Sequence, residues 1–242
     1  CMSMSDLGII NDSNRSRAVM VKTFVTTGLQ DAIGHHFGYE VVNVLTGFKY
    51  IAQKLGKYEQ AIPAEKREGY RKMSEEQTRA LRLEYSRYFV FGGEESYGYL
   101  TGSYVRDKDG VDGAYMICEM FSYYATKGIS LLDKLDELYK TYGYCLNTLH
   151  SYEFDGSAGF ARMQSIMQAF RGGIKEFGGK KVVRLLDYVQ GLDGLPKSDV
   201  LKFLLEDNCS IVVRPSGTEP KLKIYISVSA ENREAAEKVE CE

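Results

Sequence analysis

The hydrophobic and polar positions in the first half of the chain follow two alternating patterns. Short runs of β-branched and other apolar residues predict buried strands, and the segments that follow them carry apolar residues at helical spacing. Strands that alternate with helices form a parallel sheet covered by helices. We therefore expect an α/β fold with a three-layer, mostly parallel sheet. The expected strands are residues 18–26, 40–45 and 87–91, and the expected helices are residues 29–37, 48–55 and about 112–126.

The second half of the chain changes to paired strands with helices between them. Residues 129–142 predict an amphipathic helix that ends at Gly143. The pattern after it predicts a smaller α+β domain, with an antiparallel sheet and helices on one face. The expected division is a polar leader or cut end at residues 1–17, the α/β domain at residues 18–143 and the α+β domain at residues 144–242. Within the last domain we expect strands at about residues 146–154, 181–188, 210–214 and 222–229, and helices at residues 158–171 and at the end of the chain.

Two charged segments are assigned to structure rather than to binding. Residues 65–87 are rich in Glu, Lys and Arg at helical spacings such as that of Glu68 and Lys72, which predicts a solvated helix. Residues 107–112 superficially resemble a calcium-binding loop. The third acidic residue before the glycine and the Glu at position 12 are missing, so we interpret this segment as a turn and a helix cap.

Length and composition limit the possible functions. At 242 residues the chain is long enough for two domains, and its 44% of hydrophobic residues suffices for a core. Its 31 basic and 33 acidic residues nearly balance, which argues against a nucleic-acid partner. The cysteines are scattered and lack C-x-x-C spacing, so we expect reduced thiols of a cytoplasmic protein rather than a zinc site or a disulfide framework. Apolar runs are too short to cross a membrane, so no membrane partner is expected.

Three loops follow the three predicted strands of the α/β domain, at residues 26–28, 46–49 and 91–98. Each loop carries Gly together with a polar group. Because ligands of parallel sheets bind outside the carboxyl ends of the strands, we expect these loops to form one concave, ligand-sized site. The threonines of the first two loops also suit a simpler role as helix caps.

The loop at residues 91–98 is acidic and bracketed by glycines. Glycine lets the backbone approach a ligand closely, and the loop presents the short side chains of Glu94 and Ser96 at the end of a strand. A carboxylate only accepts hydrogen bonds, whereas a hydroxyl donates and accepts, and two adjacent hydroxyls of a hexose need this combination. We interpret the loop as a clamp for sugar hydroxyls, although an ordinary loop after a strand has a similar composition.

A second candidate site is the proline-flanked turn at the start of residues 214–223. Arg214 supplies a planar fork that matches phosphate oxygens, Ser216 and Thr218 supply hydroxyls, and Gly217 lets backbone N–H groups converge on an anion. Lys223 adds a positive charge from the following strand. The pattern is not a P-loop, and the alternative is a hairpin turn with solvated charges.

Together, the motifs at residues 46–49, 93–98 and 214–221 closely resemble the α-D-phosphohexomutase family, in the order and spacing of its third and fourth domains. The Glu-Glu-Ser form of the second motif resembles the phosphoglucomutase branch. The resemblance implies sugar contacts from Thr46, Gly47, Glu94 and Ser96, an approach of Lys108 to the reacting end, and contacts to the distal phosphate from Arg214, Ser216, Gly217, Thr218 and Lys223.

Two motifs of this family are missing from the sequence. Its enzymes carry a phosphoserine in a Ser-His-Asn-Pro type loop and a magnesium site of Asp-x-Asp-x-Asp type, both in their first two domains. His35, His36 and His150 stand in other contexts. The chain therefore resembles the C-terminal half of a phosphoglucomutase, with no catalytic or metal-binding residues of its own. We expect this fragment to be inactive alone, and its partners to be a phosphosugar and the missing N-terminal domains of the same polypeptide.

For the full-length enzyme, the resemblance implies an isomerase that interconverts hexose 1-phosphate and 6-phosphate. Its cofactors would be Mg²⁺ and glucose 1,6-bisphosphate, the latter as intermediate or activator. Phosphomannomutase or phosphopentomutase specificity stays open, because these substrates share the hydroxyls and phosphate that the loops can hold. Two rival interpretations are a non-catalytic phosphosugar-binding module and an interaction scaffold. A further stretch of several hundred residues with a phosphoserine loop would favour the enzyme.

Overall fold

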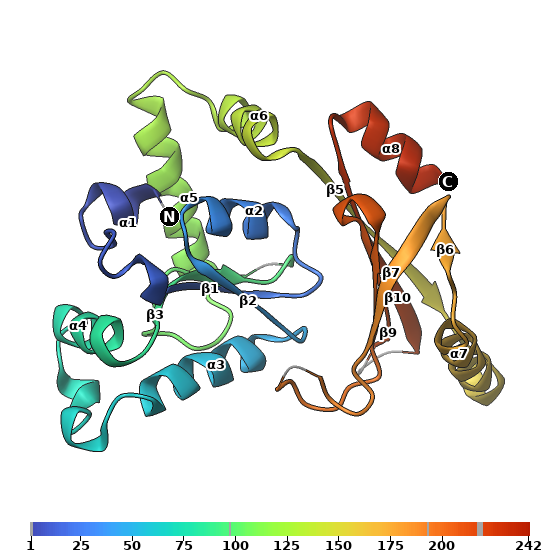
Figure 1. Ribbon diagram of the computed structural model, residues 1–242, viewed down its shortest axis with the longest axis horizontal. Coiled ribbons are helices and arrows are strands. Elements are labelled where there is room, and N and C mark those ends of the chain that lie inside the picture. The colour runs from blue at the N-terminus through green and yellow to red at the C-terminus, as the bar shows by residue number, and fades with distance from the viewer. Residues whose placement is uncertain (1, 97, 193, 217–219) are drawn as a thin grey trace. The chain divides into compact units, whose positions relative to one another are not determined.

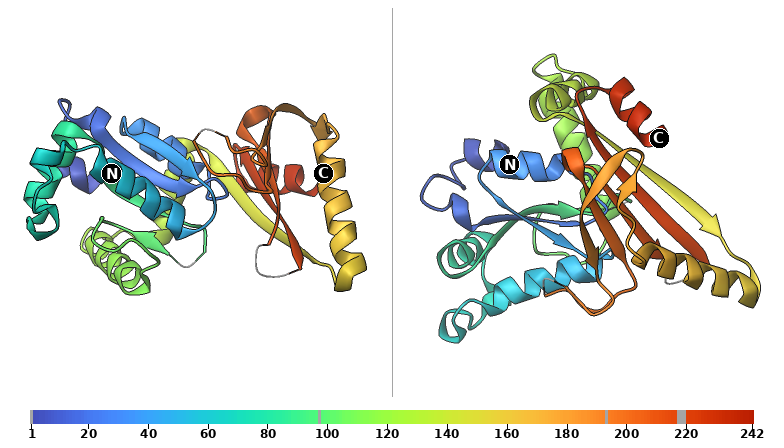
Figure 2. Two further views of the ribbon diagram at one scale, coloured as in Figure 1. Left: turned by 90° about the horizontal axis from the view of Figure 1, so that it is seen from below. Right: turned by 45° about the vertical axis from the view of Figure 1, so that its right-hand side comes forward.

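The computed structural model describes the chain apart from residues 1, 97, 193 and 217–219 (Figure 1). The chain forms two compact units. The first comprises residues 1–26 and 30–135, and the second comprises residues 27–29 and 136–242. Both sheet types expected from the sequence are present, one mostly parallel and one antiparallel (Figure 2).

The sheet of the first unit has the strand order β2-β1-β3-β4. The central strand, β1, pairs in parallel with β2 and β3, and β4 pairs antiparallel with β3. All six residues of β1 are buried, because strands flank both of its edges and helices cover both faces of the sheet (Figure 1). The predicted α/β fold is confirmed. The strands are β1 (Ala18–Thr23), β2 (Glu40–Val44), β3 (Tyr88–Gly93) and β4 (Tyr99–Leu100).

Helices cover both faces of this sheet. The chain moves from β1 to β2 in one direction across the sheet and from β2 to β3 in the other. Because crossovers between parallel strands are right-handed, the connecting helices α2 and α3 lie on opposite faces, as Figure 1 shows. Phe48, Ile51 and Leu55 form the buried side of α3. The helices are α1 (Met2–Asp6), α2 (Leu29–His36), α3 (Phe48–Gln60), α4 (Glu75–Tyr85), α5 (Gly110–Ala125) and α6 (Leu131–Tyr142).

The prediction of one solvated helix over residues 65–87 is wrong. The segment contains two 3-10 turns, η2 (Ala64–Lys66) and η3 (Tyr70–Lys72), before α4 begins. Gly69 interrupts helical geometry with a φ of 71°, and Ser74 starts α4 with a capping box. The segment is also not wholly solvated, since Arg82 is 2% exposed and donates a hydrogen bond to the hydroxyl of Tyr70.

The interpretation of residues 107–112 as a helix cap is confirmed. Asp109 is the N-cap of α5, and its carboxylate accepts hydrogen bonds from the backbone N–H groups of Val111 and Asp112. At the start of the chain, α1 and the 3-10 turn η1 (Arg15–Arg17) precede β1. Ile10, between them, is 1% exposed and packs with Ala18 in the core of the first unit.

The sheet of the second unit is antiparallel, with the strand order β5-β10-β9-β8-β7-β6. Met163 and Met167 of α7 share one core cluster with Ala236 of α8, so both helices pack on the same face of the sheet (Figure 1). Strands β6 and β8 were not predicted. The elements are β5 (Tyr144–Glu153), α7 (Gly156–Arg171), β6 (Glu176–Phe177), β7 (Lys180–Asp187), β8 (Leu201–Leu205), η4 (Glu206–Asn208), β9 (Ser210–Pro215), β10 (Lys221–Ala230) and α8 (Arg233–Cys241).

Candidate functional site

The acidic loop joins β3 to β4 as a tight hairpin. The backbone N–H of Glu94 donates to the carbonyl of Gly98 over 3.2 Å. Glycine is needed before and after the acidic residues for steric reasons. A Cβ on Gly92 would lie 2.2 Å from the Val21 carbonyl oxygen, and one on Gly98 would lie 2.7 Å from the ring of Phe48. The loop therefore packs closely against β1 on one side and the start of α3 on the other.

Glu94 is buried, at 6% exposed. Its Oε2 lies 2.9 Å from Nζ of Lys108. The same Nζ donates a hydrogen bond to the Ser96 carbonyl over 3.1 Å. Its Oε1 is buried and accepts no hydrogen bond from any described residue. Because a buried acceptor without a donor costs about 1–3 kcal/mol, this oxygen is suited to a donor from a ligand.

Thr46 and Gly47 lie at the junction of β2 and α3. The hydroxyl oxygen of Thr46 is buried and has no hydrogen-bond partner within the described parts of the chain. Gly47, rather than Thr46, is the N-cap of α3, and its φ of 126° requires glycine. The role of helix cap is therefore excluded for Thr46. The ring of Phe48, at the start of α3, packs against Gly98 of the acidic loop. Nζ of Lys108 lies 5.7 Å from the centroid of the same ring. The β2–α3 junction and the acidic loop are therefore neighbours.

The end of β1 adds a polar cluster that sequence reasoning missed. Lys22 is 2% exposed, and its Nζ lies 2.8 Å from Asp31 and donates to the Thr26 carbonyl over 2.9 Å. The hydroxyl of Thr23 lies 2.8 Å from that of Thr26 and donates to the Glu95 carboxylate over 3.3 Å. The lysine inside an otherwise apolar strand was the available signal. The cluster ties the first loop to the acidic loop.

The second candidate site lies on the hairpin of β9 and β10. Arg214 and Lys223 stand opposite each other in the antiparallel register, so both project from the same face of the sheet. The guanidinium of Arg214 lies 5.8 Å from the ring centroid of Tyr225 and donates to its hydroxyl over 3.5 Å. No feature of the sequence pointed to Tyr225. Ser216 donates its backbone N–H to the Lys221 carbonyl over 2.7 Å.

The Arg214 side chain still has hydrogen-bonding capacity. Its Nε is buried and has no hydrogen-bond partner among the residues that the structure describes. An Arg held against an aromatic ring with an unused donor is preorganised for an anion. Gly217 and Thr218, which complete the predicted phosphate contacts, lie outside the described residues.

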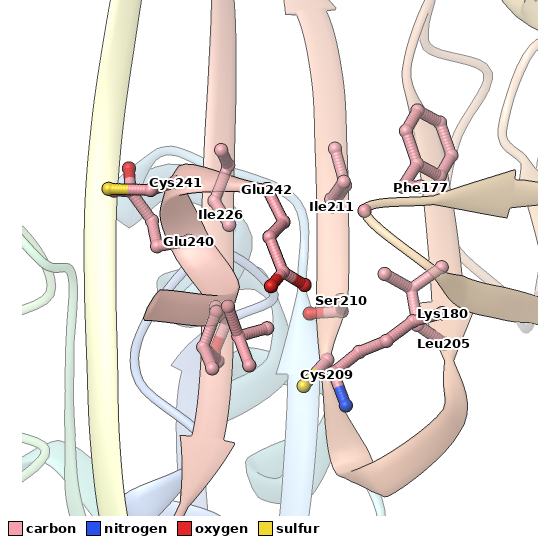
Figure 3. A pocket seen from close by; sticks show the side chains of 14 residues that line it. Phe177, Lys180, Leu205, Cys209, Ser210, Ile211, Ile226, Glu240, Cys241 and Glu242 are labelled. Atoms are coloured by element: carbon pink, nitrogen blue, oxygen red, sulfur yellow. The ribbon is translucent and has the colours of Figure 1, made fainter. Parts of the chain in front are cut away.

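A cavity of the second unit lies elsewhere. It has a volume of about 270 Å³ and is lined by residues of β6 to β10 and α8, among them Phe177, Cys209 and Glu242 (Figure 3). Of the predicted site residues that the structure describes, none lines it.

Among the described residues, no three of His, Cys, Asp and Glu gather as a metal site. Within the same residues, none of the helices combines the length and apolar character needed to cross a bilayer.

Comparison with known families now identifies the class of protein. Residues 7–142 match the phosphoglucomutase/phosphomannomutase alpha/beta/alpha domain III, and residues 155–241 match the C-terminal domain of the same family. The chain belongs to the phosphoglucomutase/phosphomannomutase family and corresponds to its C-terminal part. The resemblance seen in the sequence motifs is thereby confirmed.

Individual relatives agree with this assignment. The chain is 33% identical over 226 residues to a phosphoglucomutase of Staphylococcus aureus, covering 88% of this chain and 36% of that protein. It is 31% identical to a phosphoglucomutase of Staphylococcus epidermidis, covering 88% and 37%. The chain therefore spans little more than a third of the length of these relatives.

Solved structures support the fold. The open form of pp63/parafusin, a phosphoglucomutase from Paramecium, matches with a TM-score of 0.59 at 18% identity, over 95% of this chain and 36% of that one. A putative phosphomannomutase from Thermus thermophilus matches with a TM-score of 0.52 at 16% identity, over 98% and 37%.

Proposed function

We propose that this chain is the sugar- and phosphate-binding part of a phosphoglucomutase, which interconverts hexose 1-phosphate and 6-phosphate. The proposal is supported by family membership and by relatives that are named phosphoglucomutases. Because the chain spans 36% of such a relative, the activity is proposed for the full-length protein.

The observation that carries the proposal is the state of the Glu94 carboxylate. One oxygen pairs with Lys108 at 2.9 Å, while the other is buried and accepts no hydrogen bond from the described residues. A sugar hydroxyl would donate the missing hydrogen bond to this oxygen, and a neighbouring hydroxyl would reach Ser96 in the same loop. Thr46 and Gly47 would line the sugar, and Lys108 would face the reacting end.

The second unit would hold the phosphate that is not being transferred. Arg214 and Lys223 project from one face of the β9–β10 hairpin, and Ser216, Gly217 and Thr218 follow in the turn. Charge-assisted hydrogen bonds contribute about 1.5–3 kcal/mol each, so four of them would suffice for micromolar phosphate binding after the costs of association. The functional division would follow the predicted domains at residues 18–143 and 144–242.

The chemical step itself would depend on the preceding domains. Phosphoryl transfer is catalysed mainly by positioning and electrostatics, and the loops of this chain would position the sugar in both of its orientations. A hexose bisphosphate turned end for end presents a similar hydroxyl pair to Glu94 and Ser96. The described residues offer no metal site, so the Mg²⁺ expected for the family does not fit here and would be bound outside this chain.

The test is Glu94→Gln in the full-length enzyme. The substitution keeps the size of the side chain but removes its charge and replaces one of its two acceptor oxygens with an NH2 donor, so we expect kcat/KM for glucose 1-phosphate to fall at least tenfold. The free energy of unfolding should change by less than about 1 kcal/mol, because the partner Lys108 is 44% exposed. The matched control is Glu68→Gln, at an exposed position, which should leave kcat/KM unchanged. Unaltered kinetics in E94Q would contradict the proposal.

A further inference from the structure

Helix α5 is strongly apolar but mostly exposed. Of its sixteen residues only Asp112 and Glu119 carry charge, and only Gly113 is buried. Val111 is 82% exposed, Tyr115 67% and Phe121 59%. Burying a side chain of this size contributes about 1.5–3 kcal/mol, so leaving several of them in water is costly. A contiguous apolar surface of this kind marks an interaction site.

The exposed side of α5 has the spacing of a helix–helix interface. Val111, Ala114, Cys118, Phe121 and Ala125 follow one another at steps of three, four, three and four residues, and all five are exposed. This is the heptad spacing at which apolar residues form one seam along a helix. These five residues are called the α5 stripe.

The other side of α5 attaches the helix to its own unit. A Cβ on Gly113 would lie 3.5 Å from the Tyr99 ring, and the carboxylate of Asp112 accepts hydrogen bonds from the hydroxyls of Thr101 and Tyr104. Figure 2 shows α5 at the edge of the first unit. The α5 stripe therefore faces away from the contacts that hold the helix.

The lengths of the relatives indicate what covers this face. The matched regions are the family's domain III and its C-terminal domain, so most of the remaining length of such a relative precedes the region that this chain matches.

We propose that the α5 stripe is the docking surface for a helix contributed by the part of the full-length polypeptide that precedes this chain. An amphipathic helix with apolar residues at heptad spacing would shield the side chains of Val111, Cys118 and Phe121 from water. The inference rests on family membership and not on the proposed mutase activity. Its test needs no substrate, so the two proposals can fail independently.

Cys118 provides a direct probe of the stripe. Alkylation of individual cysteines is followed by mass spectrometry in the natural full-length polypeptide and in this 242-residue chain. We expect Cys118 to react at least tenfold more slowly in the full-length polypeptide. Cys241, also exposed, should react at the same rate in both, and the buried Cys209 should stay protected in both, which shows that both are folded.

A substitution in the stripe provides the second measurement. Phe121→Glu in the full-length polypeptide should restore fast alkylation of Cys118. The matched control is Phe160→Glu on α7, because Phe160 is 55% exposed and Phe121 is 59% exposed. Equal Cys118 rates in the two polypeptides, or a natural polypeptide that starts with this chain, would overturn the proposal. Protection that rises with the concentration of this chain alone would instead assign the stripe to self-association.

Discussion

At the scale of single residues, three predicted site residues carry a buried polar atom that has no hydrogen-bond partner among the described residues. They are Oε1 of Glu94, Oγ1 of Thr46 and Nε of Arg214. By contrast, Lys22 and Arg82 are each 2% exposed and have partners, an ion pair with Asp31 and a hydrogen bond with Tyr70. Each unsatisfied buried group costs about 1–3 kcal/mol, which a protein recovers where a ligand supplies the partner. Ser5, Arg15, Gln30 and Tyr58 also carry buried polar atoms without a described partner, so this state supports a binding role only for residues that also lie in a candidate loop or hairpin.

One prediction at this scale concerns Arg214. Arg214→Ala in the full-length enzyme removes the planar fork proposed to hold the distal phosphate, so we expect the apparent affinity for glucose 1-phosphate to weaken more than tenfold. Initial-rate kinetics measure this effect. Arg184→Ala, at an exposed position on β7 of the same sheet, is the control and should change nothing. If R214A and the control behave alike, the hairpin is not part of the site.

At the scale of elements, strand register and loop packing bring the candidate residues together. The antiparallel register of β9 and β10 sets Arg214 opposite Lys223. In the first unit, the close packing of Gly98 on Phe48 joins the acidic loop to the start of α3. Further contacts between elements are polar: Glu240 of α8 accepts a hydrogen bond from Thr148 of β5 over 2.9 Å and lies 3.0 Å from Nε2 of His150.

The contact of α8 with β5 predicts a pH dependence of stability. Hydrogen bonds from His150 and then Thr148 lower the pKa of Glu240 below its ordinary value. A lowered carboxyl pKa stabilises the folded state above the unfolded pKa, and this stabilisation is lost as the pH falls through the folded pKa. We therefore expect Glu240→Gln to lower the free energy of unfolding at pH 7 by less than about 1 kcal/mol, and by progressively less below about pH 4.5.

Urea denaturation of both proteins at pH 7, 5 and 3.5 measures this difference. The control is Glu237→Gln, which lies on the same helix and pairs with Arg233 rather than with β5. A difference between E240Q and the unsubstituted chain that grew toward low pH would contradict the assignment.

At the scale of the whole molecule, the chain carries two units with separate cores and separate candidate sites. The proposed roles are also separate: the first unit would hold the sugar and the second its distal phosphate. Since the chain spans 36% of its S. aureus relative, binding and catalysis can be tested apart.

We predict that the 242-residue chain alone has no mutase activity but binds glucose 1,6-bisphosphate. Amide NMR signals of residues 93–98 and 214–223 should shift during titration with the bisphosphate. Inorganic phosphate is the control and should shift only the second group, because it has no ring hydroxyls for Glu94 and Ser96. Turnover of glucose 1-phosphate by the chain alone would contradict the prediction of inactivity, and unshifted signals would contradict the prediction of binding.

Periodicity is a local property, and for this reason the sequence by itself determined the class of both sheets. The family followed from the motifs at residues 46–49, 93–98 and 214–221, and the matches to its domains confirm it. Strand β1, helix α2 and the helix cap at Asp109 follow from residues that are neighbours in the chain. Short elements without a strong pattern were not predicted. Strand β4 has only two residues, and β8 lies in a stretch to which the sequence pattern assigned no element. In residues 65–87 the charge pattern predicted a single helix, whereas Gly69 and the capping box at Ser74 divide the segment.

Only the tertiary structure decided which polar groups are buried and what they meet. The burial of Glu94, its contact with Lys108 and the Thr23–Glu95 link join residues that lie 14 to 72 positions apart, and no local pattern encodes them. The same holds for the exposure of α5. Its apolar sequence predicts a helix, but whether that face is covered depends on neighbours that are distant along the polypeptide.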